Sequence, residues 1–86
     1  MAQRRSDRHL AYGIALREIR SERSLSQEAL AHRAGLDRTY VSGVERGERN
    51  PSLESLLKLM DALELPLSEL ALRAEQVALH VPPTKR

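Results

Sequence analysis

Residues 26–51, which read SQEALAHRAGLDRTYVSGVERGERNP, contain two short helical patterns that meet at Gly35. Ser24 or Ser26, for the first of these helices, and Asp37, for the second, can accept a hydrogen bond from a free backbone amide at the helix start. Gly35 can take the left-handed conformation that commonly ends a helix. Isolated helices shorter than about 12–15 residues are marginal in water. We therefore expect both helices to be held by packing against the rest of the chain.

The rest of the sequence also predicts helices and shows no strand pattern. Apolar residues recur at helical spacing before the quoted stretch, where Tyr12, Leu16 and Ile19 share one face. After it, the Leu65-Pro66 pair separates two further helical patterns. The expected fold is a compact all-α bundle of five helices, at about residues 7–23, 26–34, 38–46, 53–63 and 67–77.

Inward faces follow from the same spacing. Val41 and Val44 are expected to anchor the third helix in the core. The fourth helix has the clearest apolar stripe, and we expect all of it to lie in the core: Leu53, Leu56, Leu57, Met60 and Leu63.

Composition limits the class of protein. The chain has 86 residues, enough for one domain, and it contains no cysteine, which excludes disulfides and thiolate metal sites. No apolar run approaches the roughly 20 residues that a membrane span needs, so we expect a soluble, cytoplasmic protein. The net charge of +2 permits a polyanionic partner without requiring one.

Nothing in the sequence indicates an enzyme. The three histidines, at positions 9, 32 and 80, lie far apart and lack the spacing of a metal site. No paired carboxylates, nucleophile motif or phosphate loop is present. We expect no catalytic activity, no metal and no cofactor.

The chain divides into three parts by composition. Residues 1–6 are polar and are expected to form a flexible arm, and residues 79–86, with the pair Pro82-Pro83, are expected to be extended. Residues 7–78 are expected to form the single helical domain between these two segments.

The outward face of the third helix points to DNA. The inward positions are taken by Val41 and Val44. The outward positions carry Arg38, Thr39, Ser42 and Arg46, whose side chains can hydrogen-bond to base edges or phosphates. A recognition helix presents its N-terminal residues to the major groove. The alternative is that this face is solvent-exposed and binds nothing, because three acids balance three arginines between residues 36 and 50.

Two longer segments, LREIRSERSLSQEALAHRAGL and YVSGVERGERNPSLESLLKLMDAL, carry a family resemblance. They resemble the helix-turn-helix family of the lambda repressor and Cro proteins, from about Leu10 to Leu72. Within that family, DRTYVSGVERGERNP is most similar to the controller proteins of restriction-modification systems. The resemblance implies a small dimeric regulator that binds double-stranded DNA. Residues 7–78 would then be its helix-turn-helix DNA-binding domain, with the last helix serving for dimerisation.

The resemblance also implies residue roles. Gly43 replaces a longer polar residue of many related repressors, so a direct base contact is not expected there and a close backbone approach is. Arg20, late in the first helix, would pair with Glu45. Base contacts would come from Arg38, Thr39 and Tyr40, and backbone contacts from Gln27, Ser42, Arg46 and Asn50.

A single small domain makes few DNA contacts, so we expect a homodimer on a palindromic operator. Some apolar residues are not needed for the inward faces of the helices, and they predict the dimer interface: Leu65, Leu72, Val77, Leu79 and Val81. The alternative is that Val77, Leu79 and Val81 fold back on their own core. Contact with RNA polymerase would follow if the dimer activates transcription as well as represses it. The rival functions are an antitoxin and a phage-type repressor.

Overall fold

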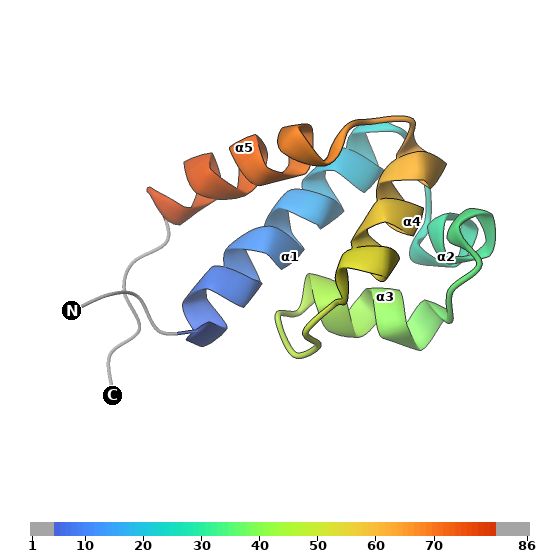
Figure 1. The fold of residues 1–86 in the computed structure, drawn as a ribbon, viewed down its shortest axis with the longest axis horizontal. Coiled ribbons are helices and arrows are strands. Elements are labelled where there is room, and N and C mark those ends of the chain that lie inside the picture. The colour runs from blue at the N-terminus through green and yellow to red at the C-terminus, as the bar shows by residue number, and fades with distance from the viewer. Residues whose placement is uncertain (1–4, 81–86) are drawn as a thin grey trace.

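A computed structural model describes residues 5–80, with side chains from residue 8 onward. These residues form five helices and no strand (Figure 1). The expected all-α, five-helix architecture is confirmed. In chain order the helices are α1 (Arg5–Glu22), α2 (Gln27–Ala34), α3 (Arg38–Glu45), α4 (Leu53–Leu63) and α5 (Leu67–Ala78).

Short polar side chains start the three middle helices. The hydroxyl of Ser26 accepts a hydrogen bond from the Ala29 amide at 2.9 Å, and Ser52 caps α4 in the same way through the Ser55 amide at 3.0 Å. Asp37 caps α3. Gly35 ends α2 with φ 71°, so its expected left-handed conformation is confirmed. These local signals fix where the helices begin and end.

The helices form two groups (Figure 1). The long helices α1 and α5 run side by side, and α2, α3 and α4 lie together on the other side of α1, against which α3 packs. α2 packs on both α3 and α4. The arrangement leaves one flank of α3 without any covering helix, at the lower edge of the molecule in Figure 1.

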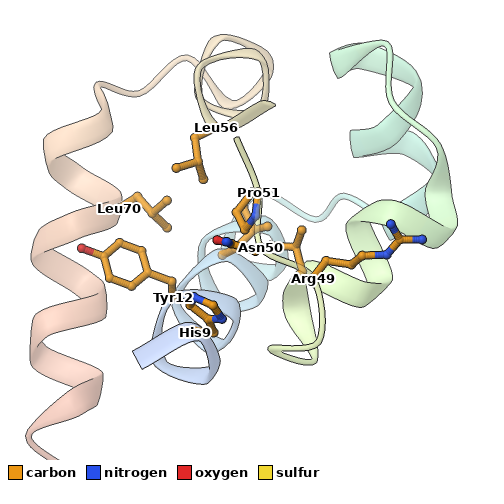
Figure 2. A pocket seen from close by; sticks show the side chains of 9 residues that line it. His9, Tyr12, Arg49, Asn50, Pro51, Leu56 and Leu70 are labelled. Atoms are coloured by element: carbon orange, nitrogen blue, oxygen red, sulfur yellow. The ribbon is translucent and has the colours of Figure 1, made fainter. Parts of the chain in front are cut away.

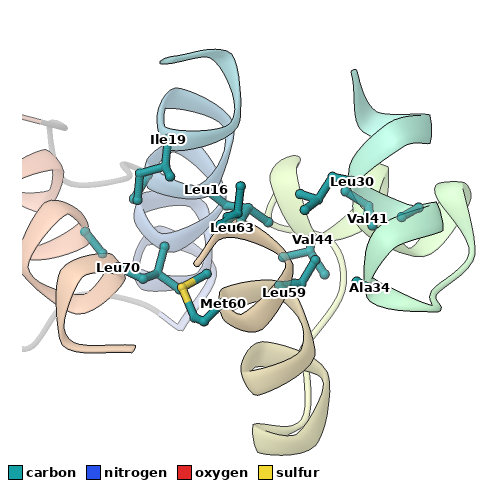
Figure 3. Close-up of a cluster of buried hydrophobic side chains, with 13 residues drawn as sticks. Leu16, Ile19, Leu30, Ala34, Val41, Val44, Leu59, Met60, Leu63 and Leu70 are labelled. Atoms are coloured by element: carbon teal, nitrogen blue, oxygen red, sulfur yellow. The ribbon is translucent and has the colours of Figure 1, made fainter. Parts of the chain in front are cut away.

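A single apolar core joins all five helices (Figure 3). Both valines of α3 are buried in it, as expected. Its largest fully buried side chains are Leu16, Leu30, Leu59, Met60, Leu63, Leu70 and Val41. None of the described residues forms a helix long and apolar enough to cross a membrane.

The expected core face of α4 is partly wrong. Leu53 is 63% exposed and Leu57 is 44% exposed, whereas Leu59, which lies off the predicted stripe, is fully buried. α4 is covered by α2 as well as by α5, and packing against α2 turns its buried face toward Leu59. Two leucines are thereby left on the surface at the start of α4.

The terminal segments fall largely outside the described residues. α1 begins at Arg5, two residues before its expected start, and only residues 1–4 of the expected arm precede it. The expected extended tail, residues 79–86, is described only at Leu79 and His80, and Val81 lies beyond that range.

The backbones of α1 and the end of α3 approach each other closely. A Cβ atom at Gly13 would lie 2.4 Å from the Val44 carbonyl oxygen and 2.5 Å from that of Glu45. A Cβ at Gly47 would lie 2.9 Å from the Leu10 Cα atom. Since the neighbours are backbone atoms, which cannot rotate away, only glycine fits at these two positions.

Substituting Gly13 separates two opposing effects. Helix propensity alone predicts that Gly13→Ala stabilises the protein by about 1 kcal/mol. The backbone contact predicts instead a loss of about 1–3 kcal/mol, the usual range for overpacking. We expect the loss, measured as the free energy of unfolding in urea.

Arg17→Ala, at an exposed position of the same helix, is the control and should change stability by less than about 0.5 kcal/mol. A gain in stability for Gly13→Ala would show that α1 and α3 do not approach this closely.

Candidate DNA interface

The uncovered side of α3 carries the residues expected to meet DNA. Arg38 and Thr39 are exposed in its first turn, Ser42 is half-buried one turn later, and Arg46 is exposed just after its end. Val41 and Val44 face the opposite way, into the core. The helix therefore presents donors and acceptors on one side while its other side is anchored.

A buried ion pair fixes the end of α3. Arg20 Nε donates to Glu45 Oε2 at 2.7 Å, and Arg20 Nη2 donates to Oε1 at 3.0 Å. The Glu45 side chain is 3% exposed and that of Arg20 is 12% exposed. Arg20 Nη1 also donates to the Leu25 carbonyl at 2.7 Å. The ion pair implied by the family resemblance is therefore present, and its two hydrogen bonds join α1 to α3.

Gln27 joins the same network. Its Nε2 donates to Glu45 Oε1 at 2.9 Å, which links the first residue of α2 to the last residue of α3. An amide nitrogen carries two hydrogens, so one remains for another acceptor. The residue implied as a phosphate contact is therefore held in place by the carboxylate of Glu45.

Burial of Glu45 changes the charge balance of the interface. The sequence shows three acids against three arginines in this region, but Glu45 is withdrawn from the surface and paired with Arg20. Neither Arg38 nor Arg49 forms an ion pair with another described residue. The exposed charge beside α3 is consequently net positive, which favours a polyanion.

Thr39 is oriented by the helix cap. Its amide donates to Asp37 Oδ1 at 2.9 Å, and its hydroxyl donates to the same oxygen at 2.8 Å. These two hydrogen bonds lower the pKa of Asp37 below its ordinary value, and nearby Arg38 and Arg49 lower it further. With its proton engaged, the Thr39 hydroxyl can act toward a partner only as an acceptor, beside its methyl group.

Arg46 is held by weak surface contacts. Its guanidinium donates to the Ser42 hydroxyl, and its Nε donates to Glu48 Oε1 at 3.0 Å. Both charged side chains of the Arg46–Glu48 pair are more than half exposed. Exposed pairs of this kind contribute little free energy, so Arg46 can exchange Glu48 for a phosphate at small cost.

The sequence did not single out Arg49, which the fold places against α3. A Cβ atom at buried Gly43 would lie 2.4 Å from Arg49 Cγ. The space beside Gly43 is therefore filled by the stem of Arg49. Its guanidinium carbon lies 5.7 Å from the centre of the Tyr40 ring, within the range of a cation–π contact. The feature of the sequence that could have indicated this position for Arg49 is Gly43, which we interpreted instead as room for a close backbone approach.

Asn50 follows in the same loop and is exposed. The residues expected at the interface thus lie on α3 itself, at the start of α2 and in the loop after α3. What the geometry shows is a helix-turn-helix with one uncovered, net positive side.

Comparison with known proteins agrees with this geometry. The family model for helix-turn-helix proteins matches residues 16–70. The control protein C.MunI of a Mycoplasma species is 44% identical over 66 residues, which cover 76% of this chain and 89% of that protein. This chain belongs to the helix-turn-helix family of restriction-modification controller proteins.

Solved structures of controller proteins share the fold. The controller C.AhdI from Aeromonas hydrophila is 53% identical with a TM-score of 0.72, over 72% of this chain and 94% of that one. The controller C.Esp1396I, solved as a tetramer with its natural 35-base-pair operator, is 33% identical with a TM-score of 0.77, over 84% and 95% of the two chains.

Variants of C.Esp1396I have been solved with single substitutions at three successive residues, an arginine, a threonine and a tyrosine. This controller has the same three residue types in the same order at Arg38, Thr39 and Tyr40.

Breaking the Arg20–Glu45 pair from either side should be costly. Arg20→Ala or Glu45→Ala strands a buried charge, and we expect a loss of about 3–5 kcal/mol in unfolding free energy. The double variant Arg20→Met/Glu45→Leu removes both charges and should lose much less than the sum of the single variants.

The exposed pair serves as the control, since Arg46→Ala should cost less than about 1 kcal/mol. Equal small losses at both pairs would contradict a structural role for the buried one.

Proposed function

We propose that this controller is a transcription regulator that binds a palindromic DNA operator as a homodimer, with α3 of each copy in the major groove. The observation that carries the proposal is the uncovered side of α3, which is net positive and rigidly backed by the core and by the Arg20–Glu45 pair. Recognition helices enter the major groove in this way in helix-turn-helix proteins.

Base reading is assigned to the start of α3. Arg38 forms no ion pair with another residue of 8–80 and can donate to O6 and N7 of one guanine. Thr39 offers an acceptor and a methyl group, the latter suited to thymine. Tyr40 is half-buried and lies against the guanidinium of Arg49, so it presents one edge near the bases.

Backbone contacts are assigned to the surrounding residues. The free hydrogen of the Gln27 amide and the α2 amides suit a phosphate. Ser42, Arg46 and the exposed Asn50 would contact the sugar-phosphate chain, and Arg49, whose guanidinium lies over the Tyr40 ring, adds a further cation. Such contacts position the protein and make its affinity fall with salt.

A dimer needs an apolar surface shared by two copies. Of the residues expected there, Leu65 and Val77 pack partly against their own core, which leaves Leu72 and Leu79 of α5 exposed. The exposed leucines of α4 form a second candidate surface. The two α3 helices of the dimer would read half-sites about 34–36 Å apart.

The sign of regulation depends on where operators lie relative to the promoter. We propose activation when one dimer is bound next to RNA polymerase and repression when a second dimer joins, with the protein acting in the cytoplasm beside the chromosome. The relatives favour this role over those of an antitoxin or a phage-type repressor.

Substitutions at Arg38 test the base-reading assignment. Arg38→Ala should weaken binding to the operator by about 5- to 150-fold, equivalent to 1–3 kcal/mol, and relax the preference at one base position. Arg38→Lys keeps the charge but loses the two-bond contact, so it should relax the preference while retaining more affinity. Fluorescence anisotropy on the operator and on single-base variants measures both effects.

Asn50→Ala is the comparison, because it should weaken binding to all DNA sequences alike. An equal loss on operator and random DNA for Arg38→Ala would contradict the assignment.

A further inference from the structure

Two hydroxyl groups on the uncovered side of α3 are held in opposite ways. Thr39 Oγ1 donates its proton to Asp37 Oδ1 at 2.8 Å, so only its lone pairs remain for a partner. Ser42 instead accepts a hydrogen bond from the Arg46 guanidinium, which leaves its own proton available. The Thr39 hydroxyl can therefore accept a hydrogen bond from a partner, whereas the Ser42 hydroxyl can donate one.

The acceptor for the Thr39 hydroxyl is itself fixed by the start of the helix. Asp37 Oδ1 also accepts a hydrogen bond from the Thr39 amide at 2.9 Å, and this bond caps α3. Asp37 cannot move away from the hydroxyl without uncapping the helix. The orientation of the Thr39 hydroxyl is thus tied to the cap that starts α3.

The charge of Asp37 strengthens this contact. The hydrogen bonds from Thr39 lower the pKa of Asp37, and the neighbouring guanidinium groups of Arg38 and Arg49 lower it further. Figure 2 shows the Arg49 side chain leaving the wall of the apolar pocket between α1 and α4 and extending toward α3. Asp37 is therefore a carboxylate at neutral pH, and hydrogen bonds to an ionised acceptor are about twice as strong as those between neutral groups.

A hydroxyl that can only accept is selective toward DNA. A threonine with a free hydroxyl bonds to donors and acceptors alike. Phosphate oxygens, guanine O6 and thymine O4 are acceptors, so none of them can bond to a hydroxyl whose proton is engaged. The hydrogen-bond donors of the major groove are the exocyclic amino groups of adenine N6 and cytosine N4.

We propose that Asp37 is a positioning residue that sets the base preference of Thr39. It holds the hydroxyl as an acceptor, so that Thr39 takes a hydrogen bond from an exocyclic amino group of adenine or cytosine in the major groove. The proposal rests on the proposed function, which places Thr39 at the base edges.

Base analogues that lack one amino group test the choice of partner. On an operator selected from random DNA, each adenine of one half-site is replaced in turn by purine and each cytosine by 2-pyrimidinone. At one position the loss of affinity should be about 3- to 10-fold larger for the wild-type protein than for Thr39→Val, which keeps the methyl group but lacks the hydroxyl. Fluorescence anisotropy measures the affinities, and the analogue that responds identifies the base as adenine or cytosine.

Two substitutions of Asp37 separate the orientation of the hydroxyl from the charge. Asp37→Asn keeps an oxygen that can accept from Thr39, whereas Asp37→Gly removes it. Both remove the charge, and both residues are tolerated at the start of a helix. The dependence on the amino group should remain in Asp37→Asn and fall below about twofold in Asp37→Gly, because the released hydroxyl can rotate. A role in capping alone predicts that both variants keep the wild-type base preference.

Circular dichroism checks that the Asp37 variants keep their helices. If Asp37→Gly does not fold, the comparison of wild-type with Thr39→Val still decides whether the hydroxyl accepts from an amino group. A loss that depends on Thr39 when a purine N7 is replaced by carbon would show the hydroxyl donating and would overturn the proposal. An equal loss for Thr39→Val on operator and random DNA would indicate a phosphate contact and would overturn it as well.

The two possible failures are distinguishable through Arg38. If Arg38→Ala still relaxes the preference at its own base position but no amino group depends on Thr39, the role of Asp37 is wrong and the regulator stands. If neither Arg38 nor Thr39 affects any base preference, the entry of α3 into the major groove is wrong, and both proposals fail.

Discussion

One buried carboxylate holds the DNA-reading part of the molecule together. Glu45, at the end of α3, accepts two hydrogen bonds from Arg20 of α1 and one from Gln27 of α2. A charge this deeply buried is costly unless it is paired and hydrogen-bonded, so arrangements of the three helices that break the contact are disfavoured. The pair thus selects one orientation of α3, the one that leaves its outward side uncovered.

Small residues let that orientation be reached. α1 meets the end of α3 at Gly13, where no Cβ atom fits, and the loop after α3 crosses α1 at Gly47 for the same reason. The buried valines then fix the rotation of α3 about its own axis. Because the end of the helix is clamped, its exposed first turn is held rigidly, and rigid placement is what base reading requires.

Much of the fold could be predicted because its signals are local. The cap at Asp37 and the left-handed Gly35 lie where they were expected, and Ser26 is the cap out of the two expected candidates, Ser24 and Ser26. The prediction that failed, the buried face of α4, depended on which helices pack against it. The buried face of α4 turns toward Leu59 because α2 packs there, and periodicity alone does not reveal which helix covers which side.

The same limit applies to the candidate site. The outward residues of α3 follow from its period and its buried valines, but Arg49 enters the interface through a contact across a loop that only the fold creates. The aliphatic part of its side chain occupies the space beside Gly43, where the sequence had suggested a close backbone approach instead. Likewise, residues 36–50 look neutral in the sequence, with three acids and three arginines. Because Glu45 is buried and paired with Arg20, its charge no longer offsets the exposed arginines.

The central claim is that the clamped α3 helix enters the major groove of DNA. Methylation interference with dimethyl sulfate tests it most directly, because the reagent modifies guanine N7 in the major groove and adenine N3 in the minor groove. On an operator selected from random DNA, the account predicts that guanine methylation blocks binding in two half-sites about one helical turn apart, while adenine methylation does not. Interference confined to the adenines would contradict it.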